Sequence, residues 1–309
     1  MPNRLKAGYI FNAMSEKQDF SKSALFEVLD PPELTAALVL NSPHSGRQYP
    51  AAFVAQSRLT AEALRRSEDC FVDELFAQCV NLGAPMLRAN FPRAYIDVNR
   101  EPFELDPKMY IEALPSYVNS QSPRVCGGLG TIPRIVGDGL EIYRHRFLFT
   151  EALHRIESVY RPYHKALRDL LSRTHSHFGQ ACLLDCHSMP STIRLGERGV
   201  RPDFIIGDRF GTSASRDLCQ AAIYLLQAQG FVVAHNKPYA GGFITEHYGR
   251  PSRGLHAIQI EVNRGLYLDE QNFQKSSGFG SLKQTIDLFL EEFAAMIDTA
   301  ALKPPLAAE

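Results

Sequence analysis

Two histidines lie where apolar segments end, and together they could hold a metal ion. His187 ends the segment ACLLDCH (181–187), and His44 ends the segment ALVLNSPH (37–44). If both segments are strands of one largely parallel sheet, their carboxyl ends meet at the edge where ligands bind. Two neutral imidazoles and a carboxylate, with a fourth position open to water, form the usual catalytic zinc arrangement. We therefore predict that His44 and His187 share one Zn²⁺ ion; the alternatives are an exposed loop histidine and a core histidine.

The carboxylate ligand is expected in the acidic segment SEDCFVDELF (67–76). Ser67 can cap the start of a helix, and acidic residues in a first helical turn are already explained by the helix dipole. Asp69 and Asp73 lie one turn apart beside an apolar stripe, so that either could face a cleft. We predict Asp69 as the third ligand, with Asp73 as the alternative.

A further carboxylate, Glu261, lies within the strand-like segment LHAIQIEVNR (255–264). A carboxylate among buried apolar neighbours costs several kcal/mol unless it has a partner or a function. An ion pair with Arg264 would be a purely structural explanation. As a catalytic residue, Glu261 would act as a general base that takes a proton from metal-activated water and returns it to a leaving amine.

Several arginines could bind an anionic substrate, because a planar guanidinium holds a carboxylate with two parallel hydrogen bonds. Arg93, Arg100 and Arg134 are the candidates, although each could also be an ordinary surface arginine. The segment GGFITEHYGRPSRG (241–254) has the glycines and polar residues of a mobile loop. The residues of this segment that could contact substrate are Thr245, His247 and Tyr248.

Apolar runs alternate with helical patterns along the chain, which predicts an α/β fold. The expected strands are 37–44, 85–90, 94–100, 181–187, 203–208, 231–236 and 255–264. The expected helices are 60–83, 142–175 with a kink at Pro162, 213–230 and 281–300. Helices between strands imply a mixed, largely parallel sheet that is covered on both faces. We expect one three-layer α/β/α domain over residues 1–309, with loose ends at about 1–20 and 302–309.

The composition argues against several classes of protein. The 33 basic and 34 acidic residues nearly cancel, which gives no electrostatic reason to bind nucleic acid or an anionic membrane. No run approaches the roughly 20 apolar residues of a membrane span, and the N-terminus lacks the apolar core of a signal peptide. A cytoplasmic protein with reduced cysteines is therefore expected. The histidines at 154, 164, 175 and 177 are interpreted as surface or packing residues.

The order of several motifs resembles the N-formylglutamate amidohydrolase family over roughly residues 37–270. These motifs are PHSG, NFPRAYIDVNREP, GGLGTIPR, PYHKAL, LLDCHSMPS, PDFIIGD, GGFITEHYGRP and HAIQIEVNRGLYLDE. The family is related to zinc carboxypeptidases and to aspartoacylase-like deacylases, so the resemblance implies a zinc-carboxypeptidase-like fold. It further implies that His44, His187 and an acidic residue of 67–74 bind zinc and that Glu261 is the catalytic carboxylate.

The same resemblance implies that Asn99 and Arg100 bind a substrate carboxylate and that Tyr248 belongs to a segment covering the substrate. The relatives place their second metal ligand three residues after the first histidine, where this chain has Arg47. The implied reaction is hydrolysis of an N-acyl amino acid, N-formyl-L-glutamate above all, to formate and L-glutamate. A carboxypeptidase-like or other N-acyl deacylase and a non-catalytic protein that binds small acids are the alternatives. The sequence does not indicate an oligomeric state.

Overall fold

The computed structural model describes residues 24–196 and 199–301, and its centre is a seven-stranded sheet. The strand order is β1-β3-β2-β6-β9-β7-β8, and neighbours run parallel except at the β1–β3 and β7–β9 pairs. The strands are β1 (Phe26–Leu29), β2 (Leu38–Ser42), β3 (Met86–Ala89), β6 (Ala181–Met189), β7 (Phe204–Gly207), β8 (Val233–His235) and β9 (Leu255–Asn263). The sheet is thus mixed and largely parallel, as predicted. The predicted loose ends, 1–20 and 302–309, lie outside the described residues.

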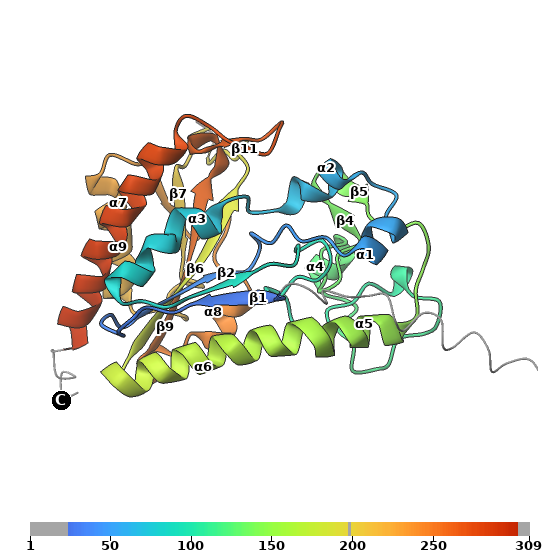
Figure 1. Ribbon diagram of the computed structural model, residues 1–309, viewed down its shortest axis with the longest axis horizontal. Helices are drawn as coiled ribbons and strands as arrows, with labels where there is room; N and C mark the ends of the chain where they lie inside the picture. Colours follow the sequence, from blue (N-terminus) through green and yellow to red (C-terminus); the bar gives the residue numbers. More distant parts are fainter. Residues whose placement is uncertain (1–23, 197–198, 302–309) are drawn as a thin grey trace, which may run out of the picture.

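Helices cover both faces of the sheet and form the outer layers of a three-layer α/β/α arrangement (Figure 1). One face carries α3 (Val72–Phe76), α7 (Arg216–Ala228) and α9 (Phe279–Ala301), and the other carries α6 (Arg161–Phe178) and α8 (Phe243–Tyr248). Each face has its own apolar core. The central strands β2 and β6 are buried along their whole length, which explains why they read as continuous apolar runs.

Shorter elements fill the connections. They comprise α1 (Ala51–Gln56), α2 (Ala61–Leu64), α4 (Pro123–Cys126) and α5 (Phe149–Arg155), with the hairpins β4 (Ile135–Val136)–β5 (Leu140–Glu141) and β10 (Leu268–Asp269)–β11 (Gln274–Lys275). The 3₁₀ turns are η1 (Arg65–Ser67), η2 (Ala77–Leu82), η3 (Pro107–Met109), η4 (Gly137–Gly139), η6 (Pro251–Arg253) and η7 (Arg264–Leu266). Within the described ranges, no helix combines the length and apolar character that crossing a lipid bilayer requires.

The prediction of a single helix over 60–83 is wrong, because the segment forms four short elements, α2, η1, α3 and η2. The main break is at Phe71, whose backbone adopts the left-handed conformation with φ 60°. Just before it, the Asp69 amide donates to the His44 carbonyl at 3.0 Å. Tertiary hydrogen bonding therefore replaces helical bonding here, and it brings the Asp69 backbone to the chain segment that follows β2.

The strand predicted over 94–100 is also wrong, because this segment forms a series of buried turns. Backbone amides of this segment donate hydrogen bonds to a loop and to a side chain of the segment itself rather than to a neighbouring strand. The Asp97 amide donates to the Thr131 carbonyl at 2.7 Å, and the Asn99 amide donates to Asp97 Oδ1 at 2.8 Å. The alternating apolar and polar residues of YIDVNR thus belong to a buried segment that does not pair with a strand.

The long helix predicted over 142–175 begins later, with α5 at Phe149, and continues through α6 to Phe178. The two parts join through a π-helical turn, η5 (Ile156–Tyr160). Pro162, where a kink was predicted, follows directly as the second residue of α6. Since proline lacks an amide hydrogen, a local change in the hydrogen-bonding pattern at this point is expected.

Candidate active site

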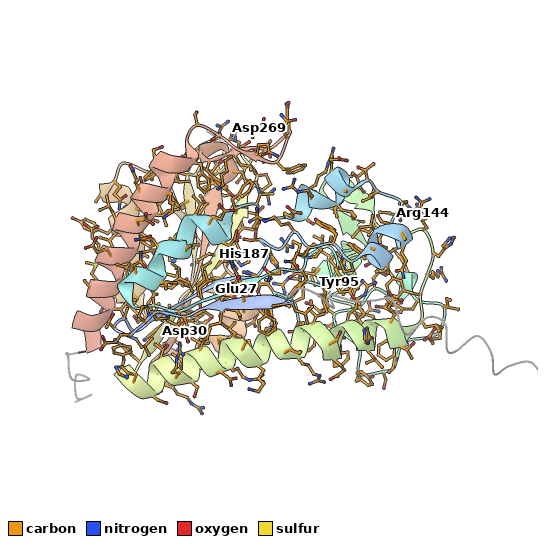
Figure 2. All side chains as sticks on the ribbon, in the orientation of Figure 1. Glu27, Asp30, Tyr95, Arg144, His187 and Asp269 are labelled. Atoms are coloured by element: carbon orange, nitrogen blue, oxygen red, sulfur yellow. The ribbon has the colours of Figure 1, made fainter. Side chains whose placement is uncertain are left out.

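Three predicted metal ligands meet at the carboxyl ends of β2 and β6. His44 lies just after β2, His187 lies in β6, and Asp69 lies in the break before α3; all three are buried. Asp69 Oδ2 is 3.1 Å from His187 Nδ1 and 3.4 Å from His44 Nδ1, and the two imidazole centres are 4.9 Å apart. Figure 2 shows His187 near the middle of the molecule. The two histidines are therefore close enough to share one ion.

The Nε2 atom of each imidazole contacts a carboxylate that is not among the residues predicted for the site. His44 Nε2 lies 2.7 Å from Asp97 Oδ1, and His187 Nε2 lies 2.9 Å from Asp185 Oδ2. Carboxylates in these positions fix the ring orientation and leave Nδ1 to face a metal. A signal for Asp185 was present, because residues i and i+2 of a strand share a face, as Asp185 and His187 do.

The spacing of the three ligand atoms fits a zinc ion. Bonds of about 2.0–2.2 Å at tetrahedral angles separate two ligand atoms by roughly 3.3–3.6 Å, close to the two distances measured from Asp69 Oδ2. His44 Nδ1 is buried and makes no hydrogen bond in the described structure, as expected of an atom that binds a metal ion. Asp73, the alternative ligand, lies instead 3.4 Å from Arg47 and 3.4 Å from Arg88.

The other Asp69 oxygen is fixed by two hydrogen-bond donors. Ser188 Oγ donates to Asp69 Oδ1 at 2.9 Å, and Arg264 Nη2 donates to the same atom at 3.1 Å. Burial alone would raise the pKa of Asp69, but His187 and His44 outweigh it and hold that pKa well below its usual range. Burial opposes charge on His187 as well, yet the adjacent Asp185 and Asp69 carboxylates raise the pKa of His187. The carboxylates of this cluster therefore stabilise positive charge between the two imidazoles.

Glu261 lies on β9, directly opposite His187 on β6. It is buried, and its Oε1 accepts a hydrogen bond from Gln259 Nε2 at 2.8 Å. Burial raises the pKa of Glu261 to about 7, although the nearby His187 opposes this rise. The proposed ion pair with Arg264 is not among the contacts of the described residues, since Arg264 contacts Asp69. A carboxylate with a pKa near neutrality is suited to accept and return a proton.

These groups open into a cavity of about 700 Å³, a size typical of small-molecule sites. Its wall contains His44, Asp69, His187 and Glu261, and it is rich in arginine. The arginines that line it are Arg66, Arg93, Arg100, Arg124, Arg209 and Arg264. The same wall includes Asn99, Asn236, Tyr239 and Gln259. Such a lining favours a small substrate that carries negative charge.

The predicted substrate-binding residues Arg93, Asn99 and Arg100 all line this cavity. Arg93 Nη2 donates to Asp97 Oδ2 at 2.7 Å, and Asn99 Oδ1 accepts from the Ile244 amide at 2.8 Å. Arg100 donates from Nε and Nη1 to backbone carbonyls at 2.9 and 2.8 Å. Burial lowers the pKa of Arg100 to about 10, so that the side chain remains a cation at neutral pH.

Four other predicted substrate-binding residues are not among the described residues of the cavity wall. Arg134 donates to Asp106 at 2.8 Å, and Thr245 donates to the Gly242 carbonyl at 2.9 Å. Tyr248 is buried with its hydroxyl 2.8 Å from His164 Nδ1, and His247 borders a separate hollow beside α6. The prediction of a loop over 241–254 is wrong for its first half, which forms α8 and packs against β9.

His164, interpreted from the sequence as a surface or packing residue, is buried and holds the segment that carries Asn99. Its Nε2 lies 2.9 Å from the Val98 carbonyl, while Tyr160 donates to the Arg100 carbonyl at 2.7 Å. Burial lowers the pKa of His164 to about 4, so that a neutral ring donates from Nε2 and accepts from Tyr248. The backbone on both sides of Asn99 is thereby fixed from α6 and η5.

Comparisons with known proteins agree with this architecture. The family model for N-formylglutamate amidohydrolase matches residues 36–268. N-formylglutamate deformylases of Pseudomonas aeruginosa and Pseudomonas putida are each 30% identical, over 248 and 237 residues; the matches cover 79% and 75% of this chain and 87% and 82% of the relatives.

Solved structures are similar as well. The crystal structure of N-formylglutamate amidohydrolase from Ralstonia eutropha JMP134 has a TM-score of 0.84 and 32% identity, covering 90% of this chain and 100% of the other. A gene product of Agrobacterium tumefaciens, 16% identical with a TM-score of 0.64, shares the fold over 91% of this chain and 97% of its own. The matched span extends over most of the described chain, and the positions of His44, Asp69, His187 and Glu261 lie within it. This chain belongs to the N-formylglutamate amidohydrolase family.

Proposed function

We propose that this protein hydrolyses N-formyl-L-glutamate to formate and L-glutamate, with one zinc ion held by His44, Asp69 and His187. The observation that carries the proposal is the meeting of His44 Nδ1, His187 Nδ1 and Asp69 Oδ2 beside Glu261. The relatives named N-formylglutamate deformylase support the choice of substrate. When bound, zinc supplies Lewis acidity toward a carbonyl oxygen and brings the pKa of water from 15.7 to about 7.

Glu261 is the proposed general base and acid. It accepts a proton from the attacking water as the water oxygen bonds to the formyl carbon, and it then delivers that proton to the glutamate nitrogen. The carbon–nitrogen bond breaks, and the remaining proton of the attacking water passes from the formic acid to the amine, so that formate and L-glutamate leave. Burial favours the protonated form of Glu261 and so raises the pKa of this carboxyl, which helps the side chain to return a proton after it has accepted one.

Arg100 and Asn99 are the proposed holders of a substrate carboxylate, with Arg93 beside them. The Arg100 side chain is anchored at Nε and Nη1, so its position is set before substrate arrives. Preorganised cations of this kind bind an anion without first having to be ordered. Because N-formyl-L-glutamate has two carboxylates, the arginine-rich wall also offers positive charge for the second one.

The test is an assay for formate release from purified protein, combined with elemental analysis for zinc. We expect at least one zinc per chain, of which one equivalent is lost in His187→Ala, and turnover of N-formyl-L-glutamate well above that of N-acetyl-L-glutamate and of peptides ending in glutamate. Faster release of acetate or of an amino acid would identify another N-acyl deacylase or a carboxypeptidase-like enzyme. Absence of both zinc and amide hydrolysis would identify a binding protein instead.

A further inference from the structure

A second group of side chains that could bind a metal lies at the β7–β8 edge of the sheet, outside the proposed zinc site. Asp208 follows β7, His235 ends β8, and Cys219 lies on α7. The three residues offer one oxygen, one nitrogen and one sulfur atom within 4.8 Å of one another. Asp208 and Cys219 are buried, whereas the His235 side chain is 39% exposed. The group therefore has an interior formed by the protein and one side that is open to solvent.

The distances within this group are close to those of a tetrahedral site. His235 Nε2 lies 3.2 Å from Cys219 Sγ and 3.2 Å from Asp208 Oδ1. A zinc–sulfur bond of about 2.3 Å and a zinc–nitrogen bond of about 2.0 Å place the two ligand atoms roughly 3.5 Å apart, and a nitrogen–oxygen pair roughly 3.3 Å apart. Small side-chain movements would therefore bring all three atoms to bonding distance.

Several polar atoms of this group converge on one imidazole nitrogen, while Asn236 Nδ2 also donates to Asp208 Oδ1 at 2.7 Å. His235 Nε2 has three polar neighbours, namely Cys219 Sγ, Asp208 Oδ1 and Asn236 Nδ2 at 2.9 Å. An imidazole nitrogen has either one proton or one lone pair, so it can make only one good hydrogen bond among them. A cation that takes the Nε2 lone pair would bind the sulfur and the carboxylate at the same time.

We propose that Asp208, Cys219 and His235 form a second site, which binds a thiophilic divalent cation such as Zn²⁺, with solvent as the fourth ligand. Cys219 binds as the thiolate, and its proton passes to solvent when the sulfur–metal bond forms. The ligand set of sulfur, nitrogen and oxygen favours Zn²⁺, Co²⁺ or Cd²⁺ over Mg²⁺ or Ca²⁺, which prefer oxygen ligands. A nucleophilic role for Cys219 is disfavoured, because burial and the Asp208 carboxylate raise the pKa of its thiol.

This second site adjoins the wall of the large cavity. Asn236 Oδ1 accepts hydrogen bonds from the backbone amides of Asp208 and Phe210 at 3.0 and 3.5 Å. Arg209, Phe210 and Asn236 all have positive φ values, and all three line the cavity. A cation on His235 would displace the Asn236 amide nitrogen and so disturb this turn. The inference thus goes beyond the proposed hydrolysis and links a second ion to the shape of the substrate cavity.

Cobalt titration of metal-free, full-length protein tests the proposal with a readout that is independent of activity. Only the second site has a sulfur ligand, so thiolate-to-cobalt charge transfer in the near ultraviolet reports on it alone. We expect two equivalents of Co²⁺ to bind, with the charge-transfer band following one of them. Cys219→Ser and His235→Asn should each abolish the band and reduce binding to one equivalent; the His235 position is half exposed, so this variant should fold even if the buried serine disturbs folding.

Two controls separate this site from the proposed catalytic one. Cys126→Ser changes an exposed cysteine on α4 and should keep the band. His187→Ala should lose the catalytic equivalent and keep the band; retention of both equivalents in that variant would count against the catalytic zinc site while leaving the second site intact. A wild-type protein without the band, or a band that survives in both Cys219→Ser and His235→Asn, would overturn the proposal.

Discussion

Replacement of Glu261 by glutamine separates proton transfer from the rest of the proposed reaction. The amide has nearly the same shape as the carboxyl group, and its oxygen can still accept the hydrogen bond that Gln259 donates at 2.8 Å. It cannot, however, accept a proton from water. General acid–base catalysis contributes roughly 10²–10⁴-fold to a rate, which corresponds to about 3–5 kcal/mol in the barrier. We therefore expect kcat of Glu261→Gln to fall by about 10²–10⁴-fold.

Zinc content and KM should change little in this variant. The proposed ligand atoms belong to His44, Asp69 and His187, and Glu261 is on the neighbouring strand opposite His187. The assay measures kcat and KM for formate release from N-formyl-L-glutamate, together with zinc per chain. Asp73→Asn provides a matched control: this buried carboxylate also has a raised pKa, but it contacts Arg47 and Arg88 outside the cavity wall. Its kcat should stay near that of the wild type.

The pH profile adds a second criterion. Only the ionised carboxylate can act as a base, so kcat/KM of the wild type should fall as the pH drops below the pKa of Glu261. That pKa is about 7 without a metal, and a nearby divalent cation lowers it because the cation stabilises the carboxylate. The decrease should therefore occur at or below pH 7 and should be absent from Glu261→Gln. A variant with near-wild-type kcat and an unchanged acidic limb would refute the role of Glu261.

Three further predictions concern the groups around this base. Asp185→Asn should weaken zinc affinity by roughly 10–100-fold, measured by competition with a chelator, because Asp185 orients His187 from behind at 2.9 Å. Arg100→Lys should raise KM for N-formyl-L-glutamate by about tenfold or more while thermal unfolding stays cooperative, because lysine lacks the planar fork; an unchanged KM would exclude a substrate contact. For His164, the pKa falls from 6.5 to about 4 on folding, so the stability present at neutral pH is lost as the pH drops below 6.5. Urea unfolding should show that the loss between pH 7.5 and 5 is smaller by about 2 kcal/mol in His164→Gln than in the wild type, and equal losses would contradict the assigned protonation.

The strands and their terminal residues could be predicted because both follow from local patterns. Residues 38–42 and 181–189 are buried on both faces, and such strands read as continuous apolar runs. Polar residues that interrupt these runs then mark the edge where a site forms. Since β2, β6 and β9 are neighbours in the sheet, His44, His187 and Glu261 come together from three separate parts of the sequence. Parallel pairing alone therefore gives three of the proposed chemical groups their positions.

The irregular segments could not be predicted in the same way, since their conformations depend on distant partners. The segment 67–76 contains no glycine or proline that would indicate a helix break. Its sequence therefore gives no sign that Phe71 adopts a left-handed backbone. The break is stabilised by contacts with residues that are far away in the sequence, such as the His44 carbonyl and Arg264. Tyr248 likewise turns toward His164, and nothing in its local sequence distinguishes this direction from one toward the cavity.

Regular strands and irregular segments hold different parts of the site in place. His187 and Glu261 are fixed by the hydrogen-bonded ladder between β6 and β9, which tolerates the loss of a single side chain. Asp97 and Asn99 lack such a ladder, and the backbone around them is held by His164 and Tyr160. Since Asp97 contacts His44, a change at His164 reaches the proposed metal ligands through only a few hydrogen bonds. Loss of a hydrogen bond from α6 should therefore reduce the proposed zinc binding and turnover while the sheet stays folded. Substitutions of similar size in the apolar core should instead reduce the stability of the fold.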